Sequence, residues 1–200
     1  MLAVFIRYSR LCYRQYFLLL LSLLCMTPVA RGQTVTVKLS ANPLLQVEER
    51  IPLSVALGAE VGPTPHSSLQ MVGSYRHFSA PDAHPDQGLK AYLDYRYYFR
   101  PEQPATGLFA SPFVGLGQLH LGAGDDPQFS LPRRRRTERE AGVVVGYQAL
   151  YSWLTAELFA GPAYRWQTTS GDSGSMAYTT STQFVWLRAG FTVGVRLKKQ

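Results

Sequence analysis

From Thr34 onward, apolar and polar residues alternate along the chain, with the period expected of β-strands that have two different faces. Near the C-terminus, for example, Val185, Leu187 and Val193 alternate with Arg188 and Arg196. No window carries an apolar stripe at helical spacing. The alternating runs predict eight strands, at residues 34–41, 51–61, 68–78, 88–99, 107–121, 138–149, 152–166 and 184–197.

The connections between these runs also alternate, in length. The long connections are 42–50, 79–87, 122–137 and 167–183, and the short ones are 62–67, 100–106 and 150–151. Long loops on one side and short turns on the other are typical of outer-membrane barrels, and an even strand number places both chain ends on the short-turn side. Within 107–121, Pro112, Gly115 and Gly117 interrupt the alternation, which predicts a bulge or bend.

The polar face of the predicted strands carries charges of both signs. A narrow barrel interior can hold such charges if opposite signs pair, because isolated buried charges are costly. Glu140 and Arg188 are expected at similar height near the long loops, without an assigned pairing. The candidate interior polar network consists of Lys38, Glu60, Lys90, Asp94, Arg96, Glu140, Glu157, Arg165, Arg188 and Arg196.

Aromatic residues gather toward the strand ends, as expected at two membrane interfaces. Those near the short turns are Tyr97, Phe99, Tyr147, Tyr151 and Trp153. Those near the long loops are Tyr75, Phe78, Tyr164, Trp166, Phe184 and Trp186. We therefore predict an all-β protein, an eight-stranded antiparallel up-and-down transmembrane β-barrel. A soluble lipocalin-like barrel, with the apolar face inside, is the alternative.

The N-terminal segment has the layout of a secretory signal peptide. Arg7, Arg10 and Arg14 precede an apolar run at 17–26, which is too short to span a membrane. Small residues follow near the expected cleavage point, so we predict a signal peptide at 1–32 and a barrel domain at 33–200 in the outer membrane of a Gram-negative bacterium. Cys12 and Cys25 both fall within the segment, and Leu24 argues against lipidation of Cys25.

The formal charge of +7 does not indicate a nucleic-acid-binding protein. Part of it belongs to the signal segment, and no basic surface is spread along the rest of the chain. The notable cluster is a run of four arginines, expected at the outer rim, where guanidinium groups can bind lipopolysaccharide phosphates or form a solvated loop. These residues are Arg133, Arg134, Arg135 and Arg136.

The segment 142–166 has a distinctive order of residues: Gly146, Tyr147, Gln148, Trp153, Glu157, Gly161 and Tyr164. In this order it resembles small outer-membrane barrel proteins of Bacteroidota, from a domain family of unknown function. The stretches 42–60 and 93–109 are similar to that family as well. The resemblance implies a fold and a location and no known activity. The chain ends on Gln200 rather than on the aromatic residue frequent in such barrels.

No catalytic motif stands out. The four histidines, His66, His77, His84 and His120, lack metal-ligand spacing, so we expect no metal or other cofactor. The alternative of a lipid A-modifying enzyme rests on four polar residues near the end of the third strand, His77, Ser79, Asp82 and Asp86.

An eight-stranded barrel is filled by its own side chains, so we expect no solute pore. The predicted role is structural or interactive: a monomer that contacts lipopolysaccharide or other envelope proteins through its long loops.

Overall fold

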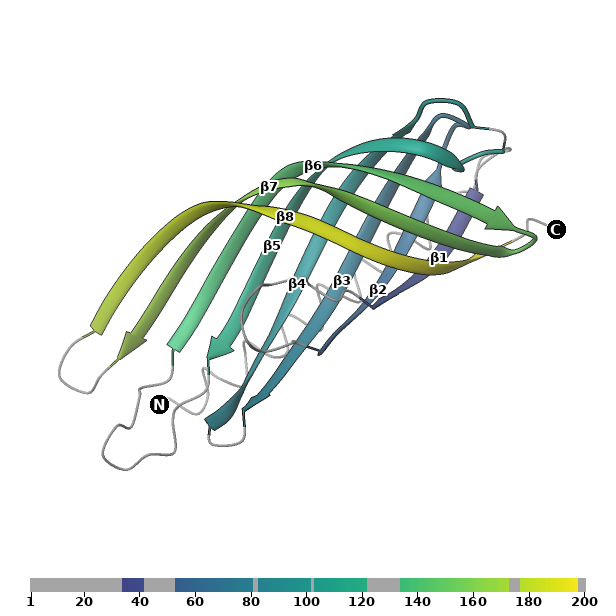
Figure 1. Cartoon of the computed structure of the whole chain (residues 1–200). Coiled ribbons are helices and arrows are strands. Elements are labelled where there is room, and N and C mark those ends of the chain that lie inside the picture. Colours follow the sequence, from purple (N-terminus) through teal and green to yellow (C-terminus); the bar gives the residue numbers. More distant parts are fainter. Residues whose placement is uncertain are drawn as a thin grey trace. The chain divides into compact units, whose positions relative to one another are not determined.

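The computed structural model describes residues 34–41, 53–80, 83–101, 103–121, 134–172 and 177–197. These residues form eight antiparallel strands in one closed ring, and each strand pairs with the next along the chain (Figure 1). The strands are β1 (Thr34–Ala41), β2 (Leu53–Gly62), β3 (Ser67–Ala80), β4 (Ala83–Tyr98), β5 (Gly107–Leu121), β6 (Arg134–Tyr151), β7 (Leu154–Asp172) and β8 (Ala177–Leu197). The predicted all-β, eight-stranded up-and-down barrel is confirmed. The predicted signal segment 1–32 lies outside the described residues.

Strands β6, β7 and β8 extend well beyond their predicted ends. Most of 167–183, expected as a loop, is strand, and β7 and β8 pair until Asp172 meets Ala177. The segment is rich in threonine and serine, which lack the apolar alternation used to locate strands. Threonine is β-branched and suits a pleated sheet, so the hairpin continues above the alternating region.

The long connection expected at 79–87 is wrong. Strands β3 and β4 remain paired until Ala80 meets Ala83, with a register shift between Phe78 and Ala80. Of the bulge or bend expected within 107–121, the bulge is not observed, since the register of β5 with both neighbours is continuous. The β4–β5 ladder only lacks pairs next to Pro112, which has no N–H group to donate.

The strands are strongly staggered around the ring. Following paired residues from Lys38 through all eight strands leads to Phe184, whereas Lys38 itself pairs with Gly194, ten residues further along β8. This offset is the shear of the barrel, and it requires strands tilted by about 35–45° from the barrel axis. Residues at the same height along the barrel axis are therefore not the ones that pair with each other from strand to strand.

The two faces of the sheet have opposite chemistry. On the outside, Leu116, Leu158 and Leu187 are exposed at 65%, 66% and 60%. On the inside, Arg96 and Arg165 are exposed at only 1%. The orientation that a lipocalin-like barrel requires is therefore not observed. Among the described residues, none forms a helix long and apolar enough to cross a membrane.

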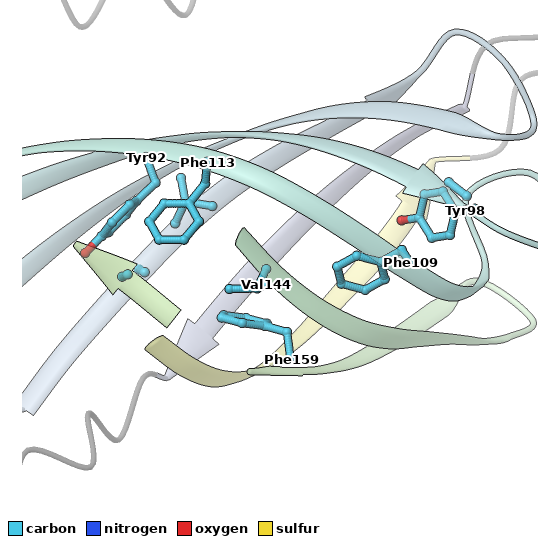
Figure 2. Close-up of a cluster of buried hydrophobic side chains, with 10 residues drawn as sticks. Tyr92, Tyr98, Phe109, Phe113, Val144 and Phe159 are labelled. Carbon is cyan, nitrogen blue, oxygen red and sulfur yellow. The ribbon is translucent and has the colours of Figure 1, made fainter. Parts of the chain in front are cut away.

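Aromatic side chains occupy the interior between the charged groups. Figure 2 shows Tyr92 beside Phe113 and Tyr98 beside Phe109, with Val144 and Phe159 between these two pairs. The ring centroids are 6.2 Å apart in the first pair and 5.5 Å apart in the second. Trp186, expected at the membrane interface, instead packs against this interior cluster.

Candidate functional site: a charged interior inside an apolar wall

One ion-pair cluster joins side chains from four strands: Lys38 of β1, Glu60 of β2, Arg96 of β4 and Glu157 of β7. Lys38 Nζ lies 2.6 Å from Glu60 Oε2 and 2.6 Å from Glu157 Oε2. Arg96 donates two hydrogen bonds to Glu157, at 2.7 and 2.6 Å. The two cations balance the two anions, which is the condition for burying all four charges.

Neutral side chains add further hydrogen bonds to this cluster. Gln148 Oε1 accepts hydrogen bonds from Lys38 Nζ at 2.7 Å and from Arg96 Nη1 at 3.1 Å. Glu60 accepts from Tyr98 at 2.7 Å and also from Ser68. The sequence prediction missed Gln148, Tyr98 and Ser68, although alternation puts Gln148 and Tyr98 on the charged faces of β6 and β4.

A second cluster lies nearer the long-loop end and contains Lys90, Glu138, Glu140 and Arg165. Glu140 Oε1 lies 2.8 Å from Lys90 Nζ and 2.6 Å from Arg165 Nε. Lys90 also pairs with Glu138, which accepts a hydrogen bond from Gln167 at 3.2 Å. Glu138 was absent from the predicted network, although it shares a strand face with Glu140. This cluster too is balanced in charge.

Arg188 forms a separate pair with Asp94. Its Nη1 lies 3.0 Å from Asp94 Oδ1, and its guanidinium carbon lies 4.0 Å from the Phe113 ring centroid and 4.3 Å from that of Tyr92. Rings at this distance stabilise a desolvated guanidinium through their negative faces. Arg188 and Glu140 thus bind different partners despite their similar expected height.

The interior is covered at the short-turn end. Arg196, the remaining residue of the predicted network, is partly buried and donates to the carbonyl oxygen of Pro104 at 2.8 Å. Gln148 donates to that of Ala105, also at 2.8 Å. Ala105 is 1% exposed, so the turn between β4 and β5 packs under the interior side chains.

The outer wall forms an apolar band. Outward positions from Leu154 to Trp166 on β7, and from Val185 to Leu197 on β8, carry no charged residue. A tilted transmembrane strand needs about 9–11 residues, so both stretches are long enough to cross a bilayer. The band and the paired interior together make the described barrel apolar outside and polar inside.

The arginine run is divided between two faces of β6. Arg135 is exposed and faces outward, whereas Arg134 and Arg136 are half-buried on the inner face. Arg136 Nε donates to Thr169 Oγ1 at 3.3 Å. Arg133 lies outside the described residues. The run therefore does not form one loop patch.

The candidate catalytic group is not described. The side chains of His77, Ser79, Asp82 and Asp86, and that of His84, lie outside the described part of the structure. Of the other histidines, His66 has its Nδ1 3.1 Å from the carbonyl oxygen of Tyr98, and His120 is exposed on β5. Within the described residues, no group of histidines, cysteines and carboxylates can hold a metal ion.

Comparisons with known proteins give a family and two similar structures. A family model described as a protein of unknown function (DUF3575) matches residues 17–164. The N-terminal β-barrel domain of Pseudomonas aeruginosa OprF is 17% identical, with a TM-score of 0.42 over 82% of this chain and 97% of that chain. A major outer membrane protein from Thermus thermophilus is 15% identical, with a TM-score of 0.43 over 83% of this chain and 100% of that chain. No curated protein matches the sequence.

Proposed function

The chain belongs to the DUF3575 family of proteins of unknown function, and we propose that it is an outer-membrane β-barrel with a structural or interaction role in the envelope. One observation carries the proposal: buried charges are paired inside the ring, while leucine, valine and aromatic side chains are exposed outside it. Water does not favour so continuous an apolar surface, whereas a bilayer does. A spanning sheet must also close, because lipid offers no hydrogen bonds to unpaired strand edges.

Side chains fill the interior of the barrel, which supports a barrel without a solute pore. Arg96, Arg165, Tyr98 and Phe109 are among the largest fully buried side chains, and the β4–β5 turn covers one end. An eight-stranded barrel has just enough interior for such side chains. The surfaces available for contacts with other molecules are therefore the outer wall and the end of the barrel where the long loops lie. We propose that a monomer contacts lipopolysaccharide or other envelope proteins there. A Bacteroidota origin is part of the same proposal, supported by the resemblance at 142–166.

Heat-modifiable gel mobility combined with membrane fractionation tests this function. The full chain is expressed in a Gram-negative host, and outer-membrane, periplasmic and soluble fractions are compared before and after boiling in SDS. We expect the protein in the outer membrane, with a shift in mobility only after boiling. A periplasmic or soluble protein without a shift would contradict the proposal.

A further inference from the structure

The outer wall of β6 carries two arginines without protein partners among the described residues. Every carboxylate whose side chain the structure describes faces the interior: Glu60, Asp94, Glu138, Glu140 and Glu157. Arg135 and Arg139, by contrast, are exposed on the outer face. Neither forms an ion pair or hydrogen bond with any described residue. This part of the wall therefore has positive charge that the described part of the protein does not neutralise.

Arg139 lies where the apolar band ends. It stands directly opposite Trp166 in the β6–β7 ladder, and the next outward pair toward the short turns is Ala141 with Tyr164. The Tyr164 and Trp166 rings contact edge to face, with centroids 4.5 Å apart. Tyrosine and tryptophan favour the boundary between hydrocarbon and headgroups, so Arg139 is at headgroup height on the loop side.

Arg139 lines a groove on this wall. Its volume is about 590 Å³. The outward side chains that line it are those of Thr137, Arg139, Trp166, Thr168, Ser181 and Gln183. Hydroxyl, amide and guanidinium groups are donors suited to phosphate oxygens, and arginine binds them with two parallel hydrogen bonds.

Arg135 extends the positive surface from this groove toward the long-loop end of the barrel. It lies four residues from Arg139 on the same strand face, a separation of about 13 Å between Cα atoms. The spacing leaves room for two phosphate groups carried by one lipid. The exposed His120 is paired with Arg135 in the β5–β6 ladder, and no described carboxylate faces either of them.

We propose that the β6–β8 wall around Arg139 and Arg135 binds the phosphate groups of an outer-leaflet anionic glycolipid of the lipid A class. The inference rests on the proposed outer-membrane location and adds a ligand and a site. This site differs from the cluster of four arginines expected from the sequence, because Arg134 and Arg136 face inward. Acyl chains would lie along the apolar band, while the phosphates meet Arg139 and the groove hydroxyls.

The test compares two double variants with the same charge change on opposite faces of one strand. R135Q/R139Q removes the outward arginines, and R134Q/R136Q is the matched control. The purified proteins are titrated in neutral detergent with bis-phosphorylated lipid A, and bound lipid is counted by native mass spectrometry. We expect R135Q/R139Q to bind at least ~10-fold more weakly than wild type, because charge-assisted hydrogen bonds are lost. The control should stay within about twofold of wild type, since its arginines face away.

Further arms identify the source of the phosphate. Dephosphorylated lipid A should bind as weakly to wild type as intact lipid A binds to R135Q/R139Q, and inorganic phosphate should not displace intact lipid A. Equal binding by R135Q/R139Q and wild type, equal losses in both double variants, or displacement by inorganic phosphate would each overturn the site. If all variants remain heat-modifiable in lipid-free detergent, any of these three results contradicts the proposed lipid site and leaves the proposed outer-membrane barrel intact. A wild type without heat-modifiable mobility contradicts the proposed function itself.

Discussion

Arg96 and Glu157 form a two-point ion pair across the barrel interior, with hydrogen bonds of 2.7 and 2.6 Å. They lie on β4 and β7, which are not neighbours in the ring, so the contact spans the lumen instead of following one strand ladder. Both groups are almost fully removed from solvent. Each charge therefore depends on its partner, because water cannot replace a lost contact.

We expect Glu157→Gln to lower the free energy of unfolding by about 3–5 kcal/mol, the range for removing one partner of a buried ion pair. Lys38 and Arg96 would then share a single carboxylate, Glu60. The measurement is a urea titration in detergent that follows the folded fraction by unboiled gel mobility. The control is R96M/E157M, which leaves Lys38 balanced by Glu60 and should cost less than the sum of R96M and E157M. Additive costs would show that the two residues are not coupled.

The sequence predicted the faces of this barrel better than its contacts. Alternation identified residues such as Lys38, Arg96 and Glu157 as one polar surface, because every second side chain of a strand points the same way. It did not predict that Glu140 meets Lys90 and Arg165 while Arg188 meets Asp94. Those contacts depend on the stagger between strands, and the stagger is a property of the closed ring that no single strand contains.

Strand ends were predictable only where the alternation continued. β5 begins and ends as predicted, at Gly107 and Leu121, whereas β8 begins seven residues before the predicted start, at Ala177. The extra residues of β8 are exposed on both faces, so no buried side produces a pattern. Threonine and serine in such a stretch suit both a loop and a strand, and only pairing with β7 decides between them.

Gly161 should be intolerant of any side chain. A Cβ atom there would lie 2.1 Å from the carbonyl oxygen of Val143 and 2.6 Å from the Cα atom of Val144. Both contacts are with backbone, so β6 and β7 would have to separate. We expect Gly161→Ala to cost about 3 kcal/mol or more, as for severe overpacking.

Gly73→Ala is the control for this change. A Cβ atom at Gly73 would meet nothing closer than the Leu57 carbonyl oxygen at 4.0 Å. The heat-modifiable fraction and the urea midpoint should fall for the Gly161 variant and remain near wild type for the Gly73 variant. Equal midpoints would show that β6 and β7 do not approach as closely as described.

The filled interior predicts that the barrel does not conduct small solutes. Liposomes that contain the protein should swell in isotonic sugar no faster than protein-free liposomes, because Arg96, Tyr98 and Phe109 are fully buried within the lumen. Liposomes with a general porin, prepared in parallel, supply the positive control. Swelling that increases with the amount of protein would contradict the closed interior.

The apolar band predicts that a charge is tolerated above it and not within it. Val145 faces outward at 51% exposure, between Ala110 on β5 and Ala160 on β7. In bilayers, Val145→Arg should cost about 2–4 kcal/mol, the range for an arginine near the midplane, whereas a charge near the interface costs about 0–1 kcal/mol. Thr179→Arg, on the exposed part of β8 above the band, is the matched variant. Urea unfolding in phosphatidylcholine vesicles measures both costs. A water-facing wall would make the two costs similarly small, and that result would contradict the outer-membrane proposal while leaving the barrel fold intact.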